Sequence, residues 1–292
     1  MAVVVSTAGS FTYESRSDRL KRELAYALQS VSREDLKACL TAVPHDVVRA
    51  FKRRGVALYQ IGKRGAQTIA SEVSEMIRAG KRGKGREHLQ ARYAHFKESA
   101  SRKAQGLRHA LRRTPQLLQA VRSDPSAVLP EVVGSVLGFA IGSGGLDANG
   151  GIPDLDLMFG IGAHRSLLTH TILVGVGAEC VGISLARLIR LVYDKLPPDH
   201  DPAWDSLHEQ TQRTITAARV GTALGLGFHL LADGTVQVGA LHGLPVELPM
   251  EAHQTIITTS GAAEAAVGAK EARTTFEEVD KRLQALRKKY QR

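Results

Sequence analysis

The sequence predicts a mainly α-helical protein, and three observations support this prediction. Apolar residues recur at helical spacing in several segments, for example at Leu20, Leu24 and Leu28. Strand-like patterns are confined to short pieces, at residues 3–5 and 235–238. Hydrophobic residues make up 43% and charged residues 23% of the 292 residues, and this balance excludes a disordered or collagen-like chain.

The N-terminal part, residues 1–125, is predicted to be a basic helical region. One helix is expected over 18–31 and a second over 32–40, closed by Pro44. Further helices are expected over 45–78 and 86–122, and glycines are expected to break the basic part of this region, because glycine weakens a helix interior. These glycines are Gly55, Gly62, Gly65, Gly80, Gly83 and Gly85.

The composition changes after Pro125, where charges become rare and glycines frequent. Residues 126–268 are predicted to form a helical, bundle-like domain with a Gly-rich region that contains the candidate metal site. One of its helices is expected over 206–232. Residues 269–292 are predicted to form a charged C-terminal helix with one apolar face.

The positive charge is concentrated in one segment. Residues 51–113 carry a net charge of +13, whereas the rest of the chain sums to −3. Such a basic segment is suited to bind phosphates of nucleic acid or the headgroups of anionic lipids. The competing interpretation is a solvated helical face that packs against an acidic neighbour. The sequence contains no zinc-finger, RNP or basic-zipper pattern.

The expected location is cytoplasmic, with contact to or insertion in a membrane left open. The N-terminus lacks the basic and apolar regions of a signal peptide. The longest uncharged apolar runs, residues 132–146, 166–178 and 220–232, contain 15, 13 and 13 residues, fewer than the roughly 18 of a typical membrane span. Buried helices of a soluble or membrane-peripheral protein are therefore the favoured interpretation. Two cysteines, Cys39 and Cys180, are too few for a disulfide scaffold.

The charge-poor part of the chain contains three pairs of polar residues, of which the last is His229 and Asp233. These two residues are four positions apart, so on a helix they lie on one face. An imidazole and a carboxylate together suit zinc, manganese or iron, and a buried aspartate is unfavourable unless it is paired or metal-bound. The alternative is that Asp233 caps the following turn, because Gly234 comes next.

The middle pair is His164 and His170, separated by six positions. A turn at 164–166, followed by a helix that begins near Ser166, would bring both rings to the start of that helix. Arg165 is then able to pair with a carboxylate or an anionic substrate oxygen. The alternative is two histidines with unrelated roles.

The first pair, Asp154 and Asp156, lies in the motif Pro-Asp-Leu-Asp. Two carboxylates this close repel each other unless a cation lies between them, although a solvated aspartate-rich turn explains the motif as well. Together the three pairs supply three carboxylates and three imidazoles, the ligands of a one- or two-metal hydrolytic site. No phosphate-binding loop of the Gly-Lys-Ser/Thr or GxGxxG kind is present.

These motifs resemble the YdjM-like family of metal-dependent hydrolases, bacterial proteins that are often attached to the inner membrane and in some cases controlled by LexA. The resemblance covers residues 130–250 and depends on Gly-Ile-Pro-Asp-Leu-Asp at 151–156, His-Arg-Ser-Leu-Leu-Thr-His at 164–170 and Gly-Phe-His-Leu-Leu-Ala-Asp at 227–233. The family is distantly similar to zinc-dependent phospholipases C, which are α-helical and cleave phosphodiesters. The metal ligands that the resemblance implies are Asp154, Asp156, His164, His170, His229 and Asp233.

The expected function is that of a metal-dependent hydrolase of a phosphoester, with zinc or manganese as cofactor. Asp154 or Asp156 is expected to act as the general base, and Arg165 to stabilise the developing negative charge. The basic segment 51–113 is expected to attract a polyanionic substrate or a membrane surface. The alternative function is a non-catalytic module that binds nucleic acid or anionic membranes, in which the histidines and aspartates form a closed structural cluster.

Overall fold

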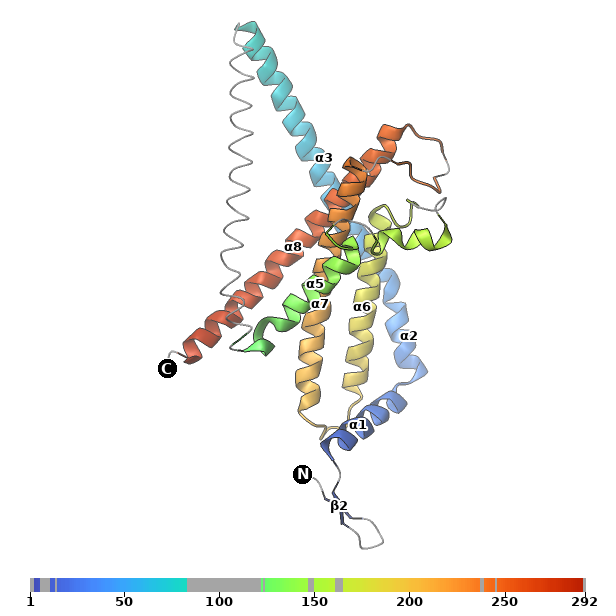
Figure 1. The fold of residues 1–292 in the computed structure, drawn as a ribbon, viewed down its shortest axis with the longest axis vertical. Helices are drawn as coiled ribbons and strands as arrows, with labels where there is room; N and C mark the ends of the chain where they lie inside the picture. Colours follow the sequence, from blue (N-terminus) through green and yellow to red (C-terminus); the bar gives the residue numbers. More distant parts are fainter. Residues whose placement is uncertain are drawn as a thin grey trace. The chain divides into compact units, whose positions relative to one another are not determined.

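The computed structural model describes residues 3–5, 11–13, 15–82, 122, 124–146, 150–160, 165–236, 239–244 and 246–290. Helices make up most of these residues, which confirms the mainly α fold class (Figure 1). A two-stranded antiparallel hairpin precedes the helices, with Val3 opposite Tyr13. The elements are β1 (Val3–Val5), β2 (Phe11–Tyr13), α1 (Arg16–Ser30), α2 (Arg33–Thr41), α3 (Val43–Lys81), α5 (Pro125–Ser143), the 3₁₀-helix η1 (Pro153–Phe159), α6 (Ile172–Asp194), α7 (Ala203–Thr235) and α8 (Met250–Tyr290).

The chain divides into two compact units. The first contains Met1–Arg54 and Pro130–Thr275, and the second contains Gly55–Leu129 and Phe276–Arg292. All of the described candidate site residues belong to the first unit. The charged helix predicted over 269–292 is the second half of α8, which begins at Met250 and continues through the predicted boundary. The domain division predicted from the sequence otherwise remains a prediction.

The glycines expected to break the basic region do not break α3. This helix continues from Val43 to Lys81 through Gly55, Gly62 and Gly65. A glycine inside a helix costs about 1 kcal/mol relative to alanine, which a helix of 39 residues can absorb. Apart from Arg122, the helix predicted over 86–122 lies outside the described residues.

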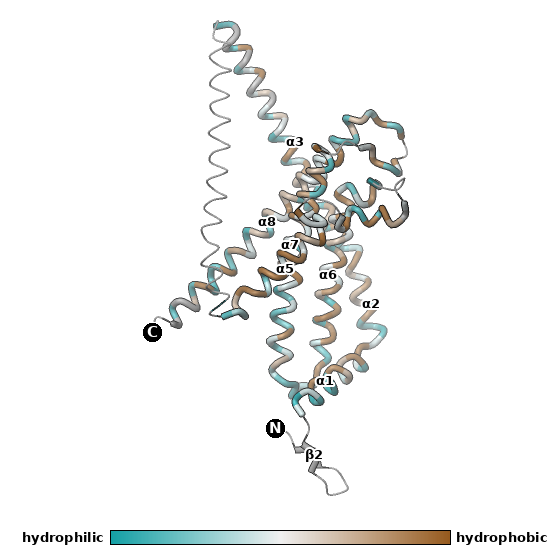
Figure 2. The backbone as a smooth tube through the Cα atoms, in the orientation of Figure 1, coloured by the Kyte–Doolittle hydropathy of each residue, from teal (hydrophilic) through white to brown (hydrophobic). Residues whose placement is uncertain are grey.

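Three helices, α5, α6 and α7, are long and apolar enough to cross a membrane, judged over the described residues by length and composition. Figure 2 shows α5 and α6 as mostly hydrophobic along their length. Isolated charges such as Glu179 and Arg187 interrupt the apolar sequence of these helices, so each strictly uncharged run is shorter than a membrane span. The structure accounts for both charges, because each one is paired inside the first unit.

The pairs join α6 to the N-terminal half of α3. Arg187 lies 2.6 Å from Asp46, and Arg54 lies 2.7 Å from Glu179. Asp46 and Arg54 are two turns apart on α3, as are Glu179 and Arg187 on α6, so the pairs fit two antiparallel helices in one register. A shift of one turn would leave buried charges unpaired, which is strongly unfavourable.

Two arginines at the start of the basic segment belong to this buried network. The Arg54 guanidinium is 1% exposed and donates through Nε and Nη2 to the two carboxylate oxygens of Glu264, at 2.5 and 2.8 Å. Arg53 pairs with Glu179 and Glu271. For these two residues the contacts fit the competing interpretation, packing against an acidic neighbour, because α6 and α8 supply their carboxylates.

Glycines bring α5 and α7 into close contact. Gly134, Gly138 and Gly142 recur every fourth residue along one face of α5. A Cβ atom added at Gly138 would overlap the backbone carbonyl of Ala218 on α7, and one added at Gly225 would overlap the carbonyl of Phe139. Helices that meet through such small-xxx-small patterns pack backbone against backbone, which is common in membrane proteins.

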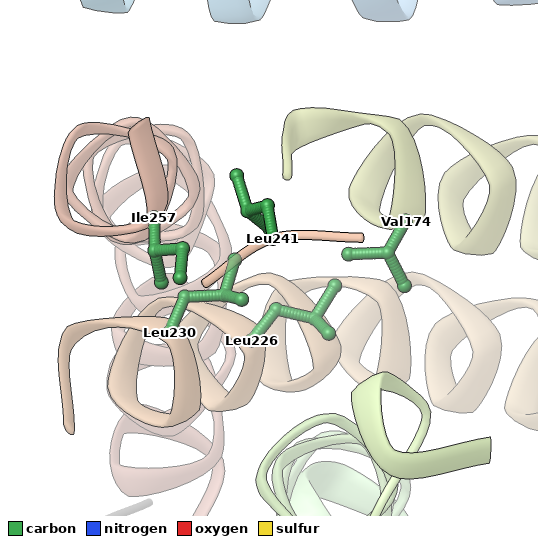
Figure 3. Packing of buried hydrophobic residues seen from close by; sticks show 5 residues of the cluster. All are labelled: Val174, Leu226, Leu230, Leu241 and Ile257. Atoms are coloured by element: carbon green, nitrogen blue, oxygen red, sulfur yellow. The ribbon is translucent and has the colours of Figure 1, made fainter. Parts of the chain in front are cut away.

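A small apolar core lies where α6, α7 and α8 meet. It contains Val174, Leu226, Leu230, Leu241 and Ile257, all no more than 7% exposed (Figure 3). Leu226 and Leu230 are one turn apart, so they form a stripe on the buried face of α7. The positions three residues after each of them, 229 and 233, belong to the same face. The core therefore directs the side chains at these two positions into the interior of the unit.

Candidate metal centre

The structure places the described site residues at one end of the three apolar helices. His229 and Asp233 lie near the end of α7, as the four-residue spacing predicted, with exposed fractions of 0% and 2%. Asp154 and Asp156 lie on η1, which follows α5. His170 is fully buried and lies two residues before α6.

One local prediction at this end is wrong. A helix was expected to begin near Ser166, but α6 begins at Ile172, and Thr171 is its N-cap. Ser166 instead belongs to a turn, in which its carbonyl accepts hydrogen bonds from the backbone N–H groups of Thr169 and His170. This turn, and not a helical face, positions His170.

Three side-chain atoms converge at the centre of the cluster. Asp154 Oδ1 lies 3.6 Å from His229 Nε2 and 3.8 Å from His170 Nε2, and all three atoms lie within 4.8 Å of one another. Ligands at 2.0–2.2 Å from a tetrahedral zinc ion are about 3.3–3.6 Å apart. Asp154, His170 and His229 are therefore close to the spacing that one metal ion requires.

Hydrogen bonds on the far side of each ring determine which nitrogen faces this centre with a lone pair. His229 Nδ1 lies 3.2 Å from the backbone carbonyl of Ser143, which can only accept, so Nδ1 bears the proton. The hydroxyl of Thr169 donates its single proton to Asp156 Oδ2, so it accepts from His170 Nδ1 at 2.9 Å. With the protons on Nδ1, the Nε2 lone pair of His229 points towards Asp154, and that of His170 points towards Asp154 and the nearer oxygen of Asp233, as in metal-bound histidines.

Asp156 contributes to the cluster from behind His170. Its Oδ2 atom accepts hydrogen bonds from the Ser166 backbone N–H, at 2.9 Å, and from the Thr169 hydroxyl, and it lies 3.5 Å from His170 Nδ1. A carboxylate in this position orients the imidazole and increases its basicity. Through this oxygen, Asp156 acts as a positioning residue.

Asp233 lies beside both rings. Its Oδ2 atom is 3.1 Å from His170 Nε2 and 3.9 Å from His229 Nε2. The same oxygen lies 3.3 Å from Arg165 Nε. Asp233 is therefore positioned either to join the metal ligands or to hold the arginine against the cluster.

The backbone around Arg165 is held in an unusual conformation. Arg165 has a φ of 63°, a left-handed value that is uncommon for residues other than glycine. A short pairing with the chain near His242 maintains it, because the His242 N–H donates to the Arg165 carbonyl and the Leu167 N–H donates to the His242 carbonyl, both at 2.9 Å. This pairing turns the guanidinium towards Asp233.

Of the six predicted ligands, the structure brings together Asp154, His170, His229 and Asp233, with Asp156 behind one ring. The sixth, His164, lies outside the described residues. Sequence reasoning missed Thr169 and Ser143. Thr169 adjoins His170 in the Thr-His motif, and this adjacency could have indicated that its hydroxyl contacts the ring. Ser143 acts through its backbone carbonyl, which no sequence pattern reveals.

The most exposed side chain of the cluster is that of Asp154, on η1. The side chain of Asp154 is 10% exposed, whereas those of His170, His229 and Asp233 are at most 2% exposed. An apolar groove of about 510 Å³ lies elsewhere, where α1 meets α6 and α7, and is lined by residues such as Leu24, Leu188 and Trp204. Its lining includes none of the cluster residues, so the cluster and not the groove is the candidate site.

The described cluster combines two oriented imidazoles with three carboxylates, and all of these residues except Asp154 are buried. His229 Nε2 has no hydrogen-bond partner among the described residues, so the cluster is not a closed hydrogen-bond network. A buried polar atom without a partner is uncommon and points to a missing ligand.

Comparison with models of known protein families, with curated proteins and with solved structures finds no match to this chain.

Proposed function

We propose that this protein is a metal-dependent hydrolase of phosphoesters, of the kind that its resemblance to the YdjM-like family implies. The observation that supports the proposal most strongly is the convergence of two imidazole Nε2 atoms on Asp154, with their Nδ1 atoms engaged elsewhere. Two lone pairs and two carboxylates that face one another repel unless a cation lies among them.

The proposed metal is zinc or manganese. Two imidazole nitrogens and one carboxylate oxygen form a frequent ligand set of catalytic zinc, which keeps a further position for water. Asp154, His170 and His229 would hold the ion, and Asp233 is the candidate fourth protein ligand. Asp156 would keep His170 in the required orientation.

When bound, the metal would lower the pKa of a water molecule and polarise a phosphoryl oxygen. In the proposed reaction, the water oxygen forms a bond to phosphorus and the bond between phosphorus and the leaving alkoxide oxygen breaks. One proton of the water passes to a carboxylate and is then delivered to the leaving oxygen, so that one water molecule is consumed for each ester cleaved. Asp154, the most exposed carboxylate of the cluster, is the proposed proton acceptor. Arg165 would stabilise the negative charge that develops on the phosphoryl oxygens.

We further propose that α5, α6 and α7 cross a membrane, with the metal centre at one end. The charged residues in the interior of these helices are paired within the first unit. Besides the pairs between α3 and α6, Glu131 on α5 forms two hydrogen bonds with Arg213 on α7, both at 2.8 Å. Internal pairing is the usual arrangement of ionisable residues in a membrane. The protein is expected to remain in the membrane fraction after extraction with alkaline carbonate, and its release would contradict insertion.

The basic segment is proposed to bind an anionic surface next to the membrane. On the described part of α3 beyond the residues paired with α6, exposed cations include Lys63, Arg64, Arg78 and Lys81. Anionic headgroups attract such residues with about 1 kcal/mol for each cation near the surface.

Hydrolysis of bis(p-nitrophenyl) phosphate tests the enzymatic proposal. Purified wild-type protein, loaded with zinc or manganese, is expected to release p-nitrophenol, and a chelator should stop the release until metal is added back. His229→Ala should be inactive, whereas His208→Ala, a change on the same helix outside the cluster, should retain activity. A metal-loaded wild type without any hydrolysis would favour the non-catalytic module.

A further inference from the structure

Large apolar side chains that flank the metal-centre residues in the sequence are exposed. We define the apolar rim as five such residues, each within three positions of a residue that contributes to the centre. They are Leu146 (88% exposed), Leu155 (51%), Leu157 (45%), Met158 (82%) and Leu168 (68%). Single exposed leucines are ordinary, but a group of them around one polar site marks a surface that meets an apolar partner.

The geometry of η1 explains how polar and apolar groups separate within a few residues. In a 3₁₀-helix, side chains three positions apart lie above one another. Pro153 and Asp156 share the face that is buried, whereas Leu155 and Met158 share a face that is exposed. The same short helix therefore directs a carboxylate inwards and two apolar side chains outwards.

The apolar rim lies at the end of the apolar helices and not on an isolated loop. The nearby half of α5 exposes Val136, Leu137 and Ile141, at 53% or more. Leu146 follows three residues after α5 ends, and Leu168 precedes α6 by four residues. If α5, α6 and α7 cross a membrane, the rim lies at the depth where the hydrocarbon meets the headgroups.

The charges near the rim exclude nucleic acid as the partner of this surface. Across the described residues 144–146, 150–160 and 165–171, the only lysine or arginine is Arg165. Its side chain is 10% exposed and is paired with Asp233. A nucleic acid is bound mainly through cations that neutralise its phosphates, and the described rim offers none on its surface.

We propose that the substrate is a phosphoester carried by a membrane lipid, whose headgroup reaches the metal centre while the apolar rim contacts the surrounding acyl chains. This proposal rests on the proposed function and specifies its substrate class. It predicts that removal of the rim's apolar character impairs the hydrolysis of lipids in a bilayer but spares the chemistry of the centre.

The double variant Met158→Glu/Leu168→Glu tests this proposal in the full-length, metal-loaded protein. The probes are vesicles of phosphatidylglycerol and phosphatidylethanolamine, their water-soluble dihexanoyl forms, and bis(p-nitrophenyl) phosphate. Because burial of one such side chain contributes about 1.5–3 kcal/mol, hydrolysis of vesicle lipids should fall by about tenfold or more. Hydrolysis of the soluble esters and the metal content should remain those of the wild type. Phe276→Glu, a matched change at an exposed residue of α8, should leave all of these rates unchanged.

The outcomes separate this proposal from the proposed function. If the wild type hydrolyses bis(p-nitrophenyl) phosphate but neither phospholipid in vesicles, the lipid substrate is wrong and the hydrolase remains. If the double variant hydrolyses vesicle lipids at the wild-type rate, the role of the rim is wrong. If the metal-loaded wild type hydrolyses none of the probes, both proposals are overturned.

Discussion

Two imidazole rings and three carboxylates lie together in the interior of this protein, and Arg165 Nε lies 3.3 Å from one of the three carboxylates, that of Asp233. Buried carboxylates are unfavourable unless cations balance them, and one guanidinium balances one of the three. The Nδ1 atoms contact the Ser143 carbonyl and the Thr169 hydroxyl, so the Nε2 atoms are the ring nitrogens that face the centre of the cluster. At this scale the spacing of His229 and Asp233 predicted their common face correctly, because a buried helix fixes that geometry. The spacing of His164 and His170 predicted less, since the turn that holds His170 depends on hydrogen bonds to Asp156 and on pairing with the distant His242.

Thr169→Val tests the orientation of His170. The variant keeps the shape of the side chain but removes the hydroxyl that connects His170 Nδ1 to Asp156. Loss of such a supporting hydrogen bond lowers metal affinity by about 10- to 100-fold. Competition with a chromophoric chelator measures this affinity. Thr255→Val, which removes a hydroxyl that bonds only within α8, should bind metal like the wild type, and equal affinities in all three proteins would refute the positioning role.

The helices are determined by different signals in different parts of the chain. The apolar spacing of Leu20, Leu24 and Leu28 predicted α1 correctly, although Leu24 and Leu28 are exposed and the residues that this helix buries are Glu23 and Ala27. The predicted breaks in α3 were wrong, since a glycine weakens a helix without ending it. The glycines of α5 have another role, because the absence of a side chain lets the backbone of α7 approach closely. This role depends on the packing partner α7, which the local sequence of α5 does not show.

Gly138→Ala tests this packing. The added methyl group would overlap the Ala218 carbonyl, and overpacking of this kind destabilises by about 1–3 kcal/mol. Gly177→Ala on α6 is the matched control, because no atom lies within 4 Å of the added Cβ and alanine favours a helix by about 1 kcal/mol. Thermal unfolding in detergent should give a lower Tm for Gly138→Ala and an unchanged or higher Tm for Gly177→Ala. A Tm of Gly138→Ala at or above that of the control would show that the close approach is unimportant.

Helix α1 is attached to the loop between α6 and α7 through carboxylates. Arg16 donates to both oxygens of Asp201, at 2.8 and 2.7 Å, and this pairing lowers the pKa of Asp201. Burial alone would raise the pKa of Glu23, but hydrogen bonds from Arg19, the Asp201 N–H and Trp204 lower it overall. Both carboxylates are therefore more acidic in the folded protein than in the unfolded chain.

The depressed pKa values predict that acid releases α1. The stabilisation is complete above the unfolded pKa values of about 4 and is lost progressively as the pH falls from there through the lower pKa values of the folded state. Trp204, the only tryptophan, donates to Glu23 at 2.9 Å and so reports the release by its fluorescence. As the pH falls from about 4 to about 2, its emission should shift to longer wavelength, and Glu23→Gln should shift it already at pH 7. The control variant Glu34→Gln, at an exposed residue, should show the same pH dependence of Trp204 emission as the wild type. A wild-type emission spectrum that does not change with pH would contradict the prediction.

At the scale of the whole molecule, the mainly α fold follows from apolar spacing that the sequence displays openly. The capacity of three helices to cross a membrane was underestimated, because Glu131, Glu179 and Arg187 interrupt apolar runs. Their partners lie on other helices and neutralise them only in the folded protein. A count of charges along the sequence does not reveal that neutralisation.

The basic segment is expected to act on the molecule as a whole by attraction to anionic surfaces. Binding of the purified protein to anionic vesicles should weaken steeply as salt is added, because salt screens charges at a distance of about 10 Å at 0.1 M. Changing exposed cations to glutamate at Lys63, Arg64, Lys81 and Arg82 should weaken binding at low salt and leave the metal content intact. Vesicle binding by this variant at the wild-type level would show that the segment merely solvates α3.

The most direct test of the account is the metal content of the purified protein. The wild type is expected to contain about one zinc or manganese ion per chain, and removal of that ion by a chelator should lower the Tm, because an ion bound only by the folded state stabilises it. His170→Ala and His229→Ala should lose the ion and the response to the chelator, whereas His208→Ala should retain both. The proposal of a metal centre would be contradicted if the wild type remained metal-free after incubation with an excess of either ion. It would also be contradicted if the wild type and His229→Ala had the same metal content.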